Sequence, residues 1–419
     1  MNETIKQRID TVHRGEVPEG YQRTRAGIMP TDWPTKTLAK DVFKSHTNKK
    51  HGGAYEVLSA TQDRGIIPRK DVDIDIKYDE ENISSYKKVD KGDFVISLRS
   101  FQGGIEYSEY EGLVSPAYTV LKATKPIDDS YYRAYFKTAN FIKRLNGAVY
   151  GIRDGKQIGF EDFGDLAIHY PPLAEQQKIA EILSTCDRVI ELKQQLLNEK
   201  RKQKQWLMQM LLDPDSGVRL PGFSQEWRTV KLGDICTIKT GKLDASAASE
   251  HGKYPFFTCS RDAFWIDTYS FDGDAILIAG NGDVGHTKLY SGKFDTYQRT
   301  YVLMNFGDLD YRLIKQCIDY TLLPVVYTEL QGGAMPYIKL STLTQLSFSV
   351  PVSAKEREAL TKVLLSADNE IDILDQELEA WQQKKKALMQ LLLTGLVRVT
   401  LNGNAGVAAT APAPTNKSE

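Results

Sequence analysis

A glycine-rich hexapeptide, GNGDVG (280–285), follows the apolar segment AILIA (275–279) and has the spacing of a dinucleotide-binding fingerprint. Such a loop binds a pyrophosphate only where it opens a helix, because the N–H groups at the helix N-terminus face the phosphates. The residues that follow, HTKLYSGKFDTYQRTYVL, have no helical period and contain a glycine turn. We therefore interpret the hexapeptide as a loop between strands and do not expect a nucleotide site there.

Other catalytic motifs are missing from the sequence. It contains no G-x-x-x-x-G-K-[ST] loop and no Asn-Pro-Pro-aromatic tetrapeptide of the kind found in amino-methyltransferases. The six histidines and four cysteines show no metal-ligand spacing. The acids of DVDIDIK (71–77) would suit a metal-dependent nuclease, but their strict alternation favours a strand with one solvated face. We therefore expect ATP hydrolysis and methyl transfer to belong to other proteins, and we expect no metal site in this chain.

Polar loops rich in glycine and basic residues indicate a different chemistry. Glycine lets the backbone approach a ligand closely, and Arg, Lys, Asn and Gln side chains can read the edges of DNA bases. The candidate DNA-binding residues in the first half of the chain are Lys49, Lys50, Arg99, Gln102, Arg153 and Lys156. Those in the second half are Lys239, Lys242, Asn281, His286, Lys288, Arg299 and Lys339. The alternative, that these loops are ordinary surface turns, stays open for each residue.

Length and composition indicate a multidomain globular protein. A chain of 419 residues with 41% hydrophobic and 26% charged residues predicts at least two packed domains. The formal net charge of −1 indicates that bulk charge alone does not hold nucleic acid. There is no apolar run of about 18 residues, and the polar N-terminus lacks a signal-peptide pattern, so we expect a cytoplasmic protein.

The chain contains an internal repeat. Residues 175–212 align without a gap with residues 356–393, an offset of 181, and both segments end in nearly the same hexapeptide, LMQMLL and LMQLLL. Upstream, DWPTKTL (32–38) matches EWRTVKL (226–232). So long a period predicts two copies of a whole domain, each followed by a helix.

The repeated segments have the heptad pattern of a coiled coil, with apolar residues at alternating steps of four and three. The predicted coiled-coil seam consists of Ile179, Leu183, Ile190, Leu197, Leu207, Leu211, Leu360, Leu364, Ile371, Leu378, Leu388 and Leu392. A basic block at 192–203 and an acidic block at 368–379 favour antiparallel pairing, in which Lys193, Lys200 and Lys204 reach acids such as Glu377 and Asp368. The alternatives are that each helix packs on its own domain, or that identical chains pair.

Between the repeated helices, matching strand segments and helical stretches predict α+β domains. The expected fold is two similar globular domains separated by two long helices that form an intramolecular antiparallel coiled coil, with a pseudo-twofold axis. The expected boundaries are an N-terminal segment (1–28), a first domain (29–172), a central spacer helix (173–213), a second domain (214–351), a distal spacer helix (352–395) and a disordered tail (396–419).

The order of elements, the near-duplicate helices, the W-x-T-x-x-L motif and the helix start PPLAEQQKIA (171–180) together resemble the specificity subunit of type I DNA restriction-modification enzymes. The resemblance covers residues 29–395. It implies a non-catalytic chain whose two target-recognition domains each read half of a bipartite double-stranded DNA target, with the spacing set by the helices. The second helix start, VPVSAKERE (350–358), departs from the family pattern.

The resemblance also implies the partners. Two methyltransferase (M) subunits that bind S-adenosylmethionine are expected to dock on the helices, and motor-nuclease (R) subunits that use ATP and Mg to complete the complex. No cofactor is expected in this chain. The alternatives are a coiled-coil scaffold or adaptor without a DNA role, and a self-sufficient nuclease or methyltransferase, which the missing motifs disfavour.

Overall fold

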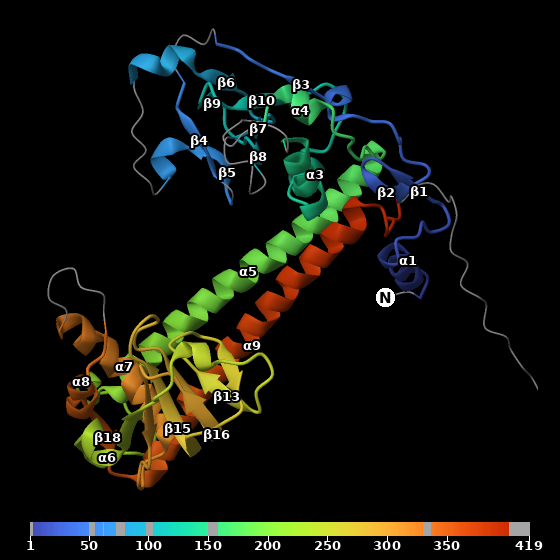
Figure 1. The fold of residues 1–419 in the computed structure, drawn as a ribbon. Coiled ribbons are helices and arrows are strands. Elements are labelled where there is room, and N and C mark those ends of the chain that lie inside the picture. The colour runs from blue at the N-terminus through green and yellow to red at the C-terminus, as the bar shows by residue number, and fades with distance from the viewer. Residues whose placement is uncertain are drawn as a thin grey trace, which may run out of the picture. The chain divides into compact units, whose positions relative to one another are not determined.

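The computed structural model describes residues 3–49, 55–61, 63–72, 80–97, 104–149, 158–329 and 337–401 (Figure 1). The chain forms two compact units, the first made of residues 1–191 and 379–419 and the second of residues 192–378. Each unit holds one α+β domain and part of each long helix, α5 (Leu173–Leu212) and α9 (Ala354–Leu393). The expected α+β class with two long helices is confirmed.

The first domain is built on a four-stranded antiparallel sheet. Its strands lie in the order β3 (Phe43–Ser45), β10 (Thr119–Ala123), β7 (Phe94–Ile96) and β8 (Ile105–Tyr107). One face of this sheet packs against the aromatic side chains of α2 (Asp129–Phe136), α3 (Ala139–Val149) and α4 (Phe160–Gly164). The other face packs against two strand pairs, β4 (Leu58–Thr61) with β5 (Gly65–Pro68) and β6 (Lys87–Val89) with β9 (Gly112–Val114).

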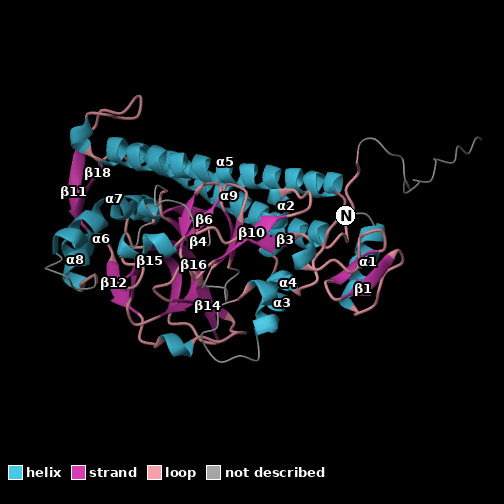
Figure 2. Ribbon diagram, turned by 90° about the horizontal axis from the view of Figure 1, so that it is seen from above, coloured by secondary structure: helices cyan, strands magenta, loops and turns pink. Residues whose placement is uncertain are grey.

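The second domain has a six-stranded sheet. Its strands lie in the order β12 (Thr237–Thr240), β17 (Thr300–Met304), β15 (Phe271–Ala279), β16 (Thr287–Thr296), β13 (Tyr254–Phe257) and β14 (Ala263–Ile266). One face packs on α7 (Tyr311–Glu329) through residues such as Ile276 and Leu303. A separate strand pair, β11 (Trp227–Lys231) with β18 (Ser347–Pro351), lies beside α6 (Leu232–Ile235) and α8 (Leu340–Gln345) (Figure 2).

The strand order shows how far the duplication extends. The order β3-β10-β7-β8 of the first sheet recurs as β12-β17-β15-β16 in the second. The sheet of the second domain then continues at its edge with the β13–β14 hairpin. Two similar domains are therefore confirmed, and the twofold relation between them stays a prediction.

The long helices pair in opposite directions. In the second unit, Lys193 Nζ lies 2.6 Å from Glu377 and Lys200 Nζ lies 2.7 Å from Glu370, while Lys204 pairs with Asp368. Partner numbers fall on α9 as they rise on α5, which is the signature of an antiparallel pair. The three lysine side chains are only 14–28% exposed, so their stems cover the seam as expected.

Burial of the seam confirms the heptad assignment. Every seam residue predicted from the sequence is buried or half-buried. At the ends of the helices, seam residues also join the domain cores, as Leu183 does in the first unit and Leu364 in the second. Leu197 and Leu378 belong to neither core and are buried by the helix pair itself. The long helices therefore pack on the domains at their ends and on each other in between.

The chain that follows α9 returns to the first domain. Arg398 donates two hydrogen bonds to Asp32 (2.8 and 2.9 Å) and two to Glu175 (2.8 and 3.0 Å). Glu175 lies in the first turn of α5, is almost fully buried, and also accepts a hydrogen bond from Trp33 Nε1 at 3.0 Å. These contacts join the start of one long helix to the segment that follows the other.

The second unit repeats this closure. Arg219, which follows α5, donates to both carboxylate oxygens of Glu356 (2.8 and 2.6 Å) in the first turn of α9. Glu356 is buried, and the guanidinium of Arg219 lies 5.5 Å from the ring of Trp227. We call Arg398–Glu175 and Arg219–Glu356 the closure pairs.

The start of the disordered tail was predicted too early. Residues 396–401 are described, and Val397 and Val399 pack on the core of the first domain. Two N-terminal elements contact the start of this segment, α1 (Glu3–His13) and the hairpin of β1 (Tyr21–Thr24) and β2 (Gly27–Pro30). Arg8 of α1 donates to the carbonyl of Leu396 at 2.6 Å, and Tyr21 of β1 donates to the carbonyl of the preceding Gly395 at 2.8 Å. The alternation in LVRV was too short to identify from the sequence. Within the described residues, no helix is both long and apolar enough to cross a bilayer.

We expect Arg398→Ala to lower the free energy of unfolding of the first unit by about 2–3 kcal/mol, because it leaves the buried Glu175 carboxylate without its cation. Hydrogen exchange measured by mass spectrometry should show faster exchange in the first unit and unchanged exchange in the second. Arg14→Ala is the control, since its ion pair with Glu16 is exposed and contributes little. Equal exchange in Arg398→Ala and the parent chain would contradict this role of the closure pair.

Candidate nucleic-acid interface

Several loops of the second domain meet at one end of its sheet. β15 ends at Ala279, which pairs with Thr300 at the start of β17, and the last residue of β12, Thr240, pairs with Tyr301. The loops that follow β12 and β15 and the loop that precedes β17 therefore emerge together. We call the residues at this end, 241–243, 258–262, 280–286, 297–299 and 337–339, the loop cluster.

Backbone hydrogen bonds hold the loop cluster together. Gly280 N–H donates to the carbonyl of Arg299 (3.0 Å), and Ile338 N–H donates to the carbonyl of Gly280 (2.8 Å). Gln298 N–H donates to the carbonyl of Leu243 at 2.9 Å. A Cβ at Gly280 would lie 2.5 Å from the Arg299 oxygen, so this position requires glycine. The hexapeptide is thus a loop between two strands, as predicted from the residues that follow it, and it does not open a helix.

The turn of the β13–β14 hairpin also belongs to this cluster. The thiol of Cys259 lies 3.4 Å from the carbonyl oxygen of Arg299. Arg261 Nε donates to Asp283 Oδ2 at 2.9 Å. Lys288 Nζ donates to the carbonyl of Ser260 at 3.2 Å and also to that of Arg261. Three separate loops are therefore fixed against one another by side-chain contacts as well as by the backbone.

The structure brings most of the sequence candidates of this domain together. Lys242, Asn281, Arg299 and Lys339 lie in the loop cluster, and Lys239 lies in β12 close to it. Lys239, Lys242, Arg299 and Lys339 are exposed, so their charges are available to a phosphate backbone. Whether any of them contacts DNA stays a prediction.

Two other candidates have surroundings that do not favour a direct contact with a phosphate. His286 is half-buried, and burial lowers its pKa below the ordinary value, so its ring is neutral near pH 7. Burial also lowers the pKa of Lys288, whose ammonium group is occupied by the two carbonyls of the hairpin turn. The geometry therefore gives Lys288 a positioning role and gives no support to direct contact with DNA.

In the first domain the corresponding region is mostly outside the described residues. Lys50, Arg99, Gln102, Arg153 and Lys156 all fall there. Lys49 is described and exposed, and its charge adds to the burial that lowers the pKa of Lys87. The DNA-binding assignments in this domain therefore stay predictions.

Two exposed residues of the loop cluster were missed by sequence reasoning. Arg261 has a side chain that is 75% exposed, and Tyr337 is 53% exposed, with Lys339 Nζ 5.9 Å from its ring centroid. The turn SRD (260–262) between the apolar segments PFF (255–257) and AFWI (263–266) was the available signal, because it is typical of a β-hairpin.

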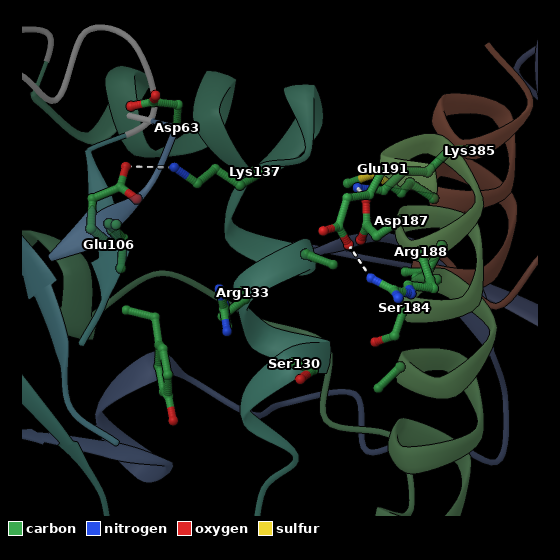
Figure 3. A pocket seen from close by; sticks show the side chains of 17 residues that line it. Asp63, Glu106, Ser130, Arg133, Lys137, Ser184, Asp187, Arg188, Glu191 and Lys385 are labelled. Carbon is green, nitrogen blue, oxygen red and sulfur yellow. Dashed lines mark hydrogen bonds and ion pairs between the residues drawn. The ribbon is translucent and has the colours of Figure 1, made fainter. Parts of the chain in front are cut away.

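A pocket of about 640 Å³ lies in the first unit between β8, α2 and the paired long helices (Figure 3). Its basic side chains are already neutralised by acids. Lys137 Nζ lies 2.5 Å from Glu106 and Arg188 lies 2.9 Å from Glu191, while Lys385 pairs with Asp187. Burial raises the pKa of Glu106. The pocket thus lacks the free positive charge that a nucleic-acid backbone requires. Among the described residues, no group of three or more His, Cys, Asp or Glu is placed to hold a metal ion.

Comparison with known proteins gives a consistent match. The model of the family described as type I restriction modification DNA specificity domain matches residues 30–200 and again residues 224–381. The MjaVIII specificity subunit of a type I restriction enzyme from Methanocaldococcus jannaschii is 26% identical over 91% of this chain and 96% of that protein. The EcoDI specificity subunit from Escherichia coli is 36% identical over 173 residues, which are 40% of this chain and 37% of that protein.

A solved structure shares the fold. The S subunit of a type I restriction-modification system from M. genitalium superposes with a TM-score of 0.58 at 17% sequence identity, over 88% of this chain and 98% of that one.

Arg299→Ala and Lys339→Ala should each weaken binding to a random duplex DNA, because each removes one exposed cation of the loop cluster. The slope of log affinity against log salt concentration should become shallower by about one for each variant. Fluorescence anisotropy over a series of salt concentrations measures both effects. Lys202→Ala, an exposed site on α5, is the matched control. If the loop-cluster variants kept the parent slope, this surface would not be the phosphate-binding face.

Proposed function

The chain belongs to the family of type I restriction-modification DNA specificity subunits, and from this premise we propose that its two domains each read one half of a bipartite double-stranded DNA target. It is a non-catalytic subunit that recognises a DNA sequence. This assignment replaces the alternatives of a scaffold without a DNA role and of a self-sufficient enzyme.

The main support for a target in two halves is that the DNA specificity domain occurs twice in one chain. The family matches residues 30–200 and 224–381, and the sheets of both domains share one strand order. Two similar recognition domains on one polypeptide present two reading surfaces to the same duplex. Because the loops outside the sheets differ in sequence, the two half-sites are expected to differ as well.

We further propose that the long helices dock two methyltransferase subunits. Leu192 and Leu196 of α5 are 46% and 45% exposed and lie one turn apart on one face, outside the seam. The repeat places Ile373 of α9 at the position equivalent to Leu192, and Ile373 is 57% exposed. Exposed apolar side chains at equivalent positions on both helices support two similar protein-binding surfaces.

The chemistry of the complex is assigned to these partners. Under this proposal the methyltransferase subunits bind S-adenosylmethionine, and motor-nuclease subunits use ATP and Mg. Our proposed location is the cytoplasm, where prokaryotic DNA lies. The duplex is then gripped jointly, which is compatible with the formal net charge of −1, because partner subunits also contact phosphates.

Exchanging residues 226–351 for the same segment of a relative with another target should change one half-site only. Mapping of modified bases in cells that express the chimera with its methyltransferase measures the result. The other half-site and the spacer should stay as in the parent, and the reciprocal exchange of the first domain should alter the opposite half. A chimera that changed both halves together would contradict independent reading by the two domains.

A further inference from the structure

We propose that Arg261 reads a guanine in the half-site of the second domain, and that Asp283 and Lys288 hold it in the reading position. The inference rests on the proposed function and names a residue that determines its specificity. Arg261 lies in the turn between β13 and β14, within the loop cluster.

The guanidinium of Arg261 is oriented by one contact and otherwise open. Its Nε donates to Asp283 Oδ2 at 2.9 Å, and the side chain is 75% exposed. Within the described part of the chain, the two terminal amino groups have no hydrogen-bond partner. Arginine donates from a rigid planar fork, and the fork formed by these two groups matches the O6 and N7 acceptors of guanine. Asp283 thus accepts from Nε of Arg261, and this contact directs the two terminal amino groups away from the protein.

The backbone of the turn between β13 and β14 is held in place by a lysine of the neighbouring strand. Lys288, on β16, donates to the carbonyls of both Ser260 and Arg261, and its ammonium group lies 5.8 Å from the ring of Phe257. These contacts immobilise the residue that carries the reading side chain. A side chain with fewer accessible positions loses less entropy on binding, so its contact discriminates more sharply.

The hairpin also has the shape that base reading requires. β13 and β14 form a two-stranded ribbon at the edge of the sheet, and the major groove of B-form DNA admits such a ribbon. The exposed Lys242, Arg299 and Lys339 lie in the same loop cluster, where phosphate contacts would position the ribbon. In the first domain the β4–β5 hairpin is likewise joined in parallel to the edge strand β8, through a bridge between Ile66 and Ser108, so a hairpin at this place belongs to both domains.

The test uses the full chain assembled with its methyltransferase subunits. Modified-base mapping first gives the target of the parent complex. Competition binding then compares duplexes in which each base pair of the second half-site is replaced in turn. The parent should discriminate about 5- to 100-fold at one G·C pair, as expected for a bidentate arginine contact. Arg261→Ala should reduce discrimination at that pair to within about 2-fold, and leave the other positions unchanged.

Two further variants distinguish recognition of the base from simple attraction by the positive charge of Arg261. Arg261→Lys keeps the positive charge without the planar fork, so it should lose discrimination at the same pair while nonspecific affinity is retained. Asp283→Asn should reduce discrimination there partially, because the fork is then less well oriented. Arg228→Ala is the matched control, since Arg228 also pairs with an aspartate in this domain, Asp308, outside the loop cluster, and its profile should equal that of the parent.

The possible results distinguish a failure of the proposed function from a failure of the role proposed for Arg261. If the parent complex recognised no bipartite sequence, the proposed function would fail. If it did so but Arg261→Ala weakened all duplexes equally, Arg261 would be a phosphate contact and this inference would be overturned. An unchanged profile in Arg261→Ala, or a second half-site without a G·C pair, would overturn it as well.

Discussion

The structure depends on one apolar seam, the contact between α5 and α9. A helix of 40 residues has too little apolar surface against its own domain to be held along its whole length, and helical stability in proteins comes mainly from packing. Leu197 and Leu378, which belong to neither domain core, are buried because the other helix covers them. The basic segment of α5 and the acidic segment of α9 then favour the antiparallel direction over the parallel one.

The closure pairs connect this seam to the domains. Each pair joins a buried glutamate in the first turn of one long helix to an arginine that follows the other helix, Glu175 to Arg398 and Glu356 to Arg219. The acid also lies where the helix dipole favours a negative charge. As a consequence, the first unit is made of two separate parts of the chain, whereas the second unit is the continuous segment 192–378, within which the closure pair joins Arg219 to Glu356. In the second domain, backbone hydrogen bonds at the end of the sheet hold together the loop cluster that we propose as the DNA-binding surface.

Features that repeat along the chain could be predicted from the sequence, whereas contacts between loops of different strands could not. Heptads recur over many turns, so the seam and even the partners of Lys193 and Lys204 could be predicted. The pairing of Arg261 with Asp283 could not, because it joins two turns whose approach depends on the sheet order. Lys288 shows the limit most clearly: its type and loop indicated a DNA contact, whereas its amine is occupied by carbonyls of the neighbouring turn. The packed segment 396–401 was too short to show a period.

We propose that the paired helices set the spacing between the two half-sites, and a change in the length of the helices tests this proposal most directly. Deleting 199–205 from α5 together with the opposing 366–372 from α9 removes one heptad, about 10 Å of rise, and keeps the seam in register. Modified-base mapping should then give the same two half-sites with a spacer shorter by about three base pairs. Deleting only one of the two segments should abolish recognition, since it breaks the register. An unchanged spacer in the double deletion would contradict the account.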